Sequence, residues 1–234
     1  SDAAGSAVGM QAGKEIKKTV LELGGSDPFI VLDDADIDKA AKTAITARFF
    51  NTGQSCIAAK RFLVHESVYD DFIDKIRKHM SSLVMGNPML ENTQIGPLAK
   101  EEFVDDLSCM VNESISQGAK LIMGGDRQGC LYNPALLVDV TYDMSVFKKE
   151  TFGPVLCVSK IKDVEEAVSL ANKSDYGLGG SLWTKNISFA KDVVKRIDTG
   201  AVFINDMTKS DPRLPFGGIN KSGYGIELSK YGIR

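Results

Sequence analysis

Hydrophobic residues follow two spacings along this chain, and segments of the two kinds alternate. Short apolar runs predict strands at residues 19–23, 28–32, 60–65, 120–123, 132–138, 155–161, 179–184 and 200–205. Apolar residues that recur every three or four positions predict helices at residues 1–18, 37–50, 101–117 and 188–197, and two more that begin at Ser67 and Asp163. This alternation predicts an α/β fold, in which a largely parallel, twisted sheet is flanked by helices in three layers.

Polar residues at the ends of these segments support the boundaries. Residues 33–36 include three aspartates just ahead of the helix predicted at 37–50. Asp163, followed by Glu165 and Glu166, is typical of a helix N-cap with acidic residues in the first turn. After Asn205 the sequence becomes glycine-rich and irregular, which is typical of a functional loop.

Composition places the chain among ordinary globular proteins. Its 234 residues are enough for one large domain or one and a half, and 43% are hydrophobic and 25% charged. A net charge of -3 argues against a nucleic-acid surface, and no apolar run is long enough to cross a membrane. The N-terminus does not resemble a signal peptide. We therefore expect a cytoplasmic protein with neither nucleic-acid nor membrane partners.

The cysteines bear on redox state and metal binding. They are widely and unevenly spaced, at Cys56, Cys109, Cys130 and Cys157. No C-x-x-C pair occurs, which argues against structural zinc, and we expect no metal site. A chain of this size does not need disulfides, and free thiols fit a reducing compartment. Cys109, in a helical segment, and Cys157, within a strand, are expected in the core.

The strongest candidate for chemistry is the polar turn at residues 51–56, Asn-Thr-Gly-Gln-Ser-Cys. A thiolate is a strong nucleophile, and the N–H groups at a loop-to-helix junction lower a thiol pKa and hold an oxyanion. Taken alone, Cys56 is more often a small buried hydrophobe. The two histidines, His65 and His79, are better interpreted as structural or surface residues. Any general base is therefore expected to be a carboxylate.

Three further motifs accompany Cys56. Glu22 lies between two leucines, ahead of two glycines, and a carboxylate there is costly to bury without a task or a partner. Residues 149–155, Lys-Glu-Thr-Phe-Gly-Pro-Val, and residues 215–223, Pro-Phe-Gly-Gly-Ile-Asn-Lys-Ser-Gly, contain glycines that let a ligand approach the backbone. Each motif taken alone is equally typical of an ordinary strand end or turn.

In this order and at these spacings, the motifs resemble the NAD(P)-dependent aldehyde dehydrogenase superfamily. The matching blocks are residues 22–25, 51–56, 149–155 and 215–225, and the resemblance extends from Ser1 to Arg234. Within the superfamily, residues 204–218 are most similar to the bacterial succinate-semialdehyde dehydrogenase branch. The resemblance implies an aldehyde dehydrogenase catalytic domain, NAD or NADP as cofactor, a small-molecule aldehyde as substrate, and a parent enzyme that is a homodimer or homotetramer.

The resemblance also implies roles for single residues. Cys56 corresponds to the nucleophile, with its own N–H as one oxyanion donor, Glu22 to the general base, and Glu227 to a second carboxylate that relays protons. The implied cofactor contacts are Ser1 and Gly5 at the end of the phosphate-binding turn and its helix, Leu23 against the nicotinamide, Glu150 on the ribose and Phe152 beside it.

An acid-bearing aldehyde needs a cation or hydroxyl donors for its carboxylate. Arg213 and Ser210, in the loop before Phe216, are candidates for these substrate contacts, because an arginine fork suits a carboxylate. A solvated loop arginine is an equally good interpretation of Arg213. These residues, together with the branch that the loop resembles, make succinate semialdehyde the predicted substrate.

The chain also departs from the family pattern, since family members are considerably longer. We expect residues 1–23 to be a remnant of the Rossmann cofactor domain, residues 24–218 the catalytic domain, and residues 219–234 a truncated C-terminal segment. An asparagine of the oxyanion hole and the strand that distinguishes NAD from NADP are expected upstream of Ser1. The 234 residues alone are therefore expected to be inactive. Ile57 follows Cys56 where some relatives carry a second cysteine, so a disulfide switch there is not available.

The residue types fit oxidation of an aldehyde to a carboxylic acid. Cys56 would form a thiohemiacetal and then a thioester, and water activated by Glu22 would hydrolyse the thioester. Two alternatives stay open. An enzyme of the same fold passes the acyl group to coenzyme A, although a positioned base favours hydrolysis. The chain could also be an isolated, non-catalytic domain.

Overall fold

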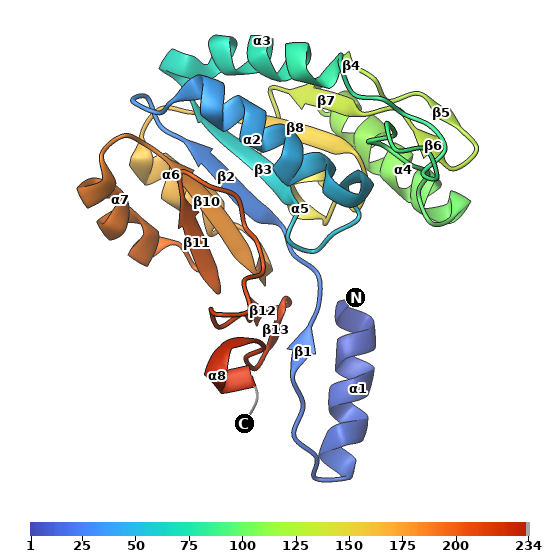
Figure 1. Cartoon of the computed structure of the whole chain (residues 1–234), viewed down its shortest axis with the longest axis vertical. Coiled ribbons are helices and arrows are strands. Elements are labelled where there is room, and N and C mark those ends of the chain that lie inside the picture. The colour runs from blue at the N-terminus through green and yellow to red at the C-terminus, as the bar shows by residue number, and fades with distance from the viewer. Residues whose placement is uncertain (233–234) are drawn as a thin grey trace.

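The computed structural model describes residues 1–232 (Figure 1). The helices are α1 (Asp2–Lys14), α2 (Ile37–Phe49), α3 (Tyr69–Met80), α4 (Glu101–Ser116), α5 (Ser145–Lys148), α6 (Val164–Ala171), α7 (Ile187–Val193) and α8 (Ser229–Gly232), with 3-10 turns η1 (Phe50–Gly53), η2 (Glu66–Val68) and η3 (Val194–Arg196). The strands are β1 (Leu21–Glu22), β2 (Asp27–Val31), β3 (Ala59–His65), β4 (Lys120–Met123), β5 (Arg127–Gln128), β6 (Leu131–Tyr132), β7 (Ala135–Val138), β8 (Val155–Ile161), β9 (Tyr176–Gly177), β10 (Gly179–Trp183), β11 (Ala201–Ile204), β12 (Ile219–Asn220) and β13 (Gly223–Tyr224).

A central sheet of seven strands organises the molecule, in the order β11-β10-β2-β3-β8-β7-β4. All neighbouring strands in it run parallel except β4 and β7, which are antiparallel. In the register, Phe62 of β3 lies between Phe29 of β2 and Val158 of β8. The predicted largely parallel sheet is confirmed. It also has an antiparallel edge strand, which the prediction did not contain.

Helices cover both faces of this sheet. Phe29 and Val31 of β2 belong to a core shared with α2 and α3, whereas Ile30 between them belongs to a core shared with α4, α5, α6 and α7. Because side chains on a strand alternate between faces, a strand covered on both sides is apolar throughout. This explains the unbroken apolar runs in the sequence and confirms the predicted three layers.

Both predicted acidic helix starts are confirmed, whereas two other local predictions are wrong. Asp36 accepts a hydrogen bond from the Lys39 N–H at 3.1 Å, and Asp163 accepts one from the Glu166 N–H at 2.8 Å. Helix α1 ends at Lys14 rather than at residue 18. Cys109 is exposed on α4, because the buried face of that helix is formed by Val104, Leu107, Val111 and Ser114, whereas Cys157 is buried as predicted.

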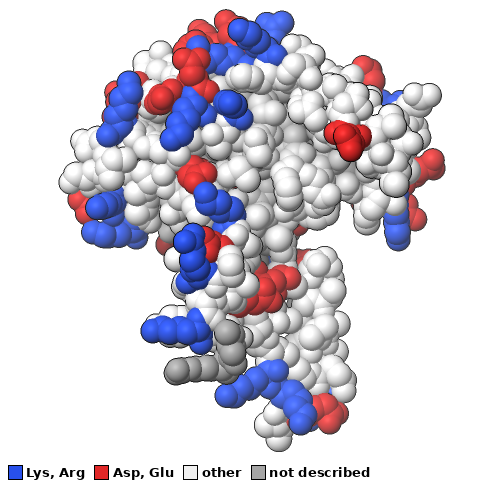
Figure 2. Space-filling model, in the orientation of Figure 1, with Lys and Arg blue, Asp and Glu red and all other residues white. Residues whose placement is uncertain are grey.

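Segments near the two ends of the chain, which contain β1 and β13, lie next to each other below the main sheet in Figure 1. Strand β1 pairs with β13, with Glu22 opposite Gly223, and β12 pairs with β9. The first and third of the three predicted segments therefore share a small sheet, while the division at residues 23 and 218 stays a prediction. On the face shown in Figure 2, basic and acidic side chains are mixed. No helix within residues 1–232 has the length and apolar character needed to cross a membrane.

Candidate active site

Three of the sequence motifs meet at one edge of the central sheet. Gly25 lies just before β2, Cys56 just before β3 and Glu150 just before β8, and these three strands are neighbours. Because the strands are parallel, their amino ends lie at the same edge. The Gly25 N–H donates a hydrogen bond to Oε1 of Glu150 at 3.0 Å, so two of the motifs are in direct contact.

Two glycines make this contact possible. A Cβ on Gly25 would lie 2.3 Å from the carbonyl oxygen of Cys56, and a Cβ on Gly24 would lie 2.4 Å from Oε2 of Glu150. Neither position has room for a side chain without movement of its neighbours. Glu22 is only three residues before Gly25, which limits its backbone to about 10 Å from this contact.

The turn that carries the candidate nucleophile has an uncommon backbone. Asn51, Thr52 and Gly53 all have positive φ, at 51°, 58° and 73°. The Asn51 side chain donates to the carbonyl of Gln54 at 2.8 Å, and the Thr52 hydroxyl accepts from the Gly96 N–H at 3.0 Å. Left-handed residues outside glycine persist only where their surroundings hold them, and they concentrate at functional sites. The turn is therefore built for a fixed shape.

Cys56 leads into a strand, so the predicted loop-to-helix junction is wrong. Its thiol is half-buried, and burial raises the thiol pKa. The positive charge of Lys60 opposes that rise, whereas the negative charges of Asp27 and Glu150 add to it. The thiol pKa thus lies above its usual value, so the thiol is protonated at neutral pH and needs a base before it can attack.

Lys60 is a residue of this site that sequence reasoning missed. Its ammonium donates to the carbonyl oxygens of Ser55, Cys56 and Ala58 at 2.9, 3.0 and 3.1 Å, and lies 3.4 Å from Oε1 of Glu150. A lysine near the start of a strand normally faces solvent. Its place beside Arg61, inside a segment from Ala58 to Val64 whose other residues are all apolar, was a signal that could have identified it.

The carboxylate of Glu22 is more buried than an ordinary surface carboxylate. Both of its carboxylate oxygens are buried and lack a hydrogen bond of normal geometry to any residue in the described range 1–232. Burial raises the pKa of Glu22, the charge of Glu227 raises it further, and the Gly218 amide opposes the shift. Glu227 itself is exposed, and its backbone pairs with Phe216. The structure therefore brings Glu22 within the electrostatic range of Glu227.

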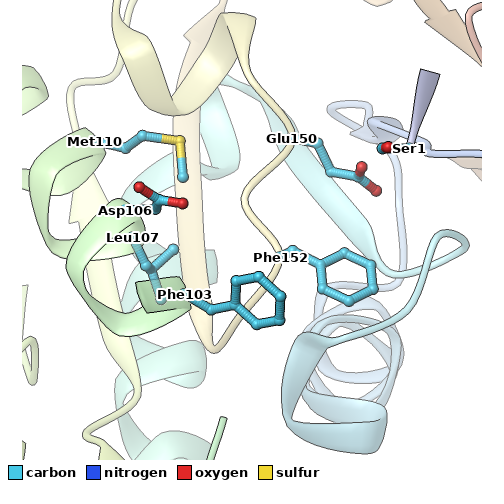
Figure 3. A pocket seen from close by; sticks show the side chains of 7 residues that line it. All are labelled: Ser1, Phe103, Asp106, Leu107, Met110, Glu150 and Phe152. Atoms are coloured by element: carbon cyan, nitrogen blue, oxygen red, sulfur yellow. The ribbon is translucent and has the colours of Figure 1, made fainter. Parts of the chain in front are cut away.

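A cavity of about 340 Å³ opens beside Glu150 (Figure 3). Helix α4 supplies one wall, and Glu150, Phe152 and Ser1 supply the other; the α4 side chains are Phe103, Asp106, Leu107 and Met110. Phe152 is 40% exposed and Phe103 is equally so, which leaves two aromatic rings free to pack on a ligand. Three of the predicted cofactor residues thus share one cavity, and Phe103 is an addition to them.

The other two predicted cofactor residues contact each other. A Cβ on Gly5 would lie 2.4 Å from Cδ1 of Leu23, so the leucine packs directly on α1 at that glycine. Ser1 caps the same helix and accepts a hydrogen bond from the Ala4 N–H at 3.4 Å. Leu23 and Gly5 do not line the cavity beside Glu150. Their cofactor roles stay predictions.

A second cavity, of about 310 Å³, flanks Cys56. Its walls come from the end of α2, from the residues on both sides of Cys56, and from the loop after β11, which contributes Lys209 and Ser210. Arg213 is not part of this lining: its side chain is 86% exposed, and it donates to Asp211 at 2.9 and 2.6 Å. Phe216 is also outside the lining. Of the predicted substrate contacts, only Ser210 lies at this cavity.

Comparison with known proteins decides the family. The description of the matching family model is "Aldehyde dehydrogenase family", and it covers residues 1–234. The chain belongs to the aldehyde dehydrogenase family. The predicted family and fold are thereby confirmed.

Two of three similar proteins in this family are named succinate-semialdehyde dehydrogenases, and the third is named lactaldehyde dehydrogenase. The chain is 48% identical to a succinate-semialdehyde dehydrogenase (NADP(+)) 1 of Mycobacterium ulcerans (strain Agy99), over all of this chain and 52% of that protein. The crystal structure of a succinate-semialdehyde dehydrogenase from Burkholderia pseudomallei matches with a TM-score of 0.97 and 39% identity, over 100% of this chain and 49% of the other. Lactaldehyde dehydrogenase from Escherichia coli matches with a TM-score of 0.96 and 37% identity, over 100% and 50%. The chain thus spans about half the length of the curated relatives it matches.

Proposed function

We propose that this chain carries the catalytic centre of an enzyme that oxidises an aldehyde, succinate semialdehyde, to the carboxylic acid with NAD(P)+. The observation that supports this most is that Gly25, Cys56 and Glu150 meet at the amino ends of three neighbouring strands. Glu22 precedes Gly25 by three residues. The names of the relatives support the substrate and the use of NADP. Because the chain spans about half of their length, the proposal concerns a full-length protein that contains it.

In the proposed reaction, the Cys56 thiol first loses its proton to a solvent base. The thiolate then forms a bond to the aldehyde carbon as the carbonyl π bond breaks, and backbone N–H groups hold the resulting oxyanion. A nicotinamide, when bound, would supply the two-electron oxidant for loss of hydride from this adduct. The acyl group then remains on Cys56 as a thioester. Glu22 takes a proton from water, the oxygen of that water attacks the thioester carbon, and the Cys56 thiolate leaves. The raised pKa of Glu22 makes its carboxylate a stronger base than an ordinary glutamate.

The cavity beside Glu150 fits the nicotinamide end of a dinucleotide. The Glu150 side chain is 17% exposed and presents a carboxylate that suits ribose hydroxyls. Phe103 and Phe152 present apolar rings at the same opening, which suits a flat heterocycle. These residues would hold and orient the cofactor.

The residues that line the cavity beside Cys56 favour an acid-bearing aldehyde as the substrate. Ser210 offers a hydroxyl donor and Lys209 an ammonium, which in this structure pairs with Asp206. Both donors come from the loop after β11, on the cavity that also contains Ser55 and Ile57, the neighbours of the nucleophile. The structure gives Arg213 less support than Lys209 as the cation for a substrate carboxylate.

The decisive test uses two variants of a full-length protein that contains this sequence. Cys56→Ala should abolish aldehyde-dependent NAD(P)H formation, with Cys109→Ala as the matched control that keeps activity. Glu22→Gln should give one rapid turnover and then stop, because the thioester accumulates. Full steady-state turnover by Glu22→Gln would refute the role of Glu22. Formation of acyl-coenzyme A rather than the acid would favour the acyl-transferring alternative.

A further inference from the structure

Lys60 is buried beside Cys56, and the proposed role of Glu22 as general base does not explain why a lysine is buried there. It is the second residue of β3, and its side chain has 0% exposure. Burying an ammonium costs several kcal/mol unless its donors and charge are matched. An ammonium has three donors, and the three carbonyls of Ser55, Cys56 and Ala58 lie at hydrogen-bond distance from Nζ. The turn that holds the nucleophile is therefore folded around this single group.

The same ammonium also reaches the cofactor side of the site. Nζ of Lys60 lies 3.4 Å from Oε1 of Glu150, and that oxygen accepts the hydrogen bond from Gly25. Lys60 thus links the Cys56 turn, the loop before β8 and the glycine before β2. These segments lead into β3, β8 and β2, three consecutive strands of the central sheet.

Burial and neighbouring charges shift the pKa values of both Lys60 and Cys56. Burial lowers the pKa of Lys60 to about 8; the negative charges of Glu150 and Asp27 oppose this shift, and the positive charge of Arg48 adds to it. Among the charges that act on the Cys56 thiol, Lys60 is the one that lowers its pKa. Lys60 carries its charge at neutral pH and loses it as the pH rises through about 8.

We propose that Lys60 is a positioning residue, which fixes the nucleophile turn against Glu150 and supplies the positive charge that favours the Cys56 thiolate. This proposal rests on the proposed function only in taking Cys56 as the nucleophile. Lys60 acts through the backbone carbonyls and through its charge, and it takes no part in proton transfer to the substrate.

The test measures the thiol and needs neither aldehyde nor cofactor. The rate of carboxyamidomethylation by iodoacetamide is followed on Cys56 from pH 6 to 10, with peptide mass spectrometry to resolve each cysteine, and exposed Cys109 serves as the internal control. Lys60→Gln keeps hydrogen-bond donors but loses the charge, and Lys60→Met loses both. Lys42→Gln, at an exposed position, is the matched control.

We expect alkylation of Cys56 in Lys60→Gln to be about three- to tenfold slower at neutral pH, with a profile displaced to higher pH, because a higher thiol pKa leaves less thiolate. Lys60→Met should be slower still, and Cys109 unchanged. A folded Lys60→Gln with the wild-type profile would overturn the proposal. Failure of the aldehyde oxidation test would leave this measurement valid.

Discussion

A methyl group at position 25 would collide with the backbone that carries the nucleophile. In Gly25→Ala the new Cβ would lie 2.3 Å from the Cys56 carbonyl oxygen, and real Cβ atoms essentially never approach another atom more closely than 3.0 Å. The carbonyl must therefore move by at least about 0.7 Å. That oxygen also accepts the Lys60 hydrogen bond at 3.0 Å, so the movement disturbs the contact that holds the turn.

Two effects of this substitution follow from that displacement. A reacting group misplaced by about 1 Å costs on the order of 10²-fold in rate, so kcat/KM for aldehyde oxidation should fall by about that factor. Overpacking a filled site costs about 1–3 kcal/mol, so the free energy of unfolding should fall by a similar amount. The left-handed residues of the chain do not include Gly25, so the cost is steric.

Activity is measured in a full-length protein, and stability by urea unfolding of the same sample. Gly13→Ala is the matched control, because a Cβ on Gly13 meets nothing within 4 Å. It should leave kcat/KM unchanged and should not lower the urea midpoint, because alanine is a better helix former than glycine within α1. A Gly25→Ala enzyme with wild-type kcat/KM and the wild-type midpoint would refute the idea that this contact positions Cys56.

Three further predictions concern single side chains. Because burial raises the pKa of Glu22 above 4.5, thioester hydrolysis in single-turnover experiments should fall as the pH decreases through a value above 4.5, and a limb at or below 4.5 would contradict the assignment. Asp163→Ala removes the cap on the Glu166 N–H and should lower the free energy of unfolding by about 1 kcal/mol in urea titrations; no change would show that the cap is not stabilising. Ser210→Ala should raise KM for succinate semialdehyde by about tenfold while Arg213→Ala leaves it unchanged, since only Ser210 lines the cavity, and equal effects would contradict this.

Local patterns predicted the elements well where burial follows directly from the sequence. The strand predicted at residues 155–161 is β8, and the cap predicted at Asp163 is present, because both depend on neighbouring residues alone. Cys109 was placed wrongly in the core. Its helical segment was predicted correctly, but which face of α4 is buried depends on what packs against it. Short pairings such as β1 with β13 were not predicted, because two residues carry no periodic signal.

The candidate site also combines features that the sequence predicted with contacts that depend on the fold. The motifs around Glu22, Cys56 and Glu150 were identified from the sequence and from the family they resemble. Their convergence depends on β3 lying between β2 and β8, where Arg61 pairs with Cys157 almost a hundred residues away in the chain. Lys60 was missed for a similar reason, because its partners are backbone carbonyls that exist as a cluster only after the turn has folded.

The amino-acid sequence alone determined the α/β class, the family resemblance and the identity of the candidate nucleophile and base, since these depend on residue types and on spacing along the chain. The tertiary structure decided which groups face one another: Cys56 against Gly25, Lys60 against Glu150, and Ser210 rather than Arg213 at the cavity. It also decided the electrostatics, because burial and the charges of distant segments displace the pKa values of Cys56, Glu22 and Lys60. Burial and long-range charge are properties of the folded arrangement, so no local pattern carries them.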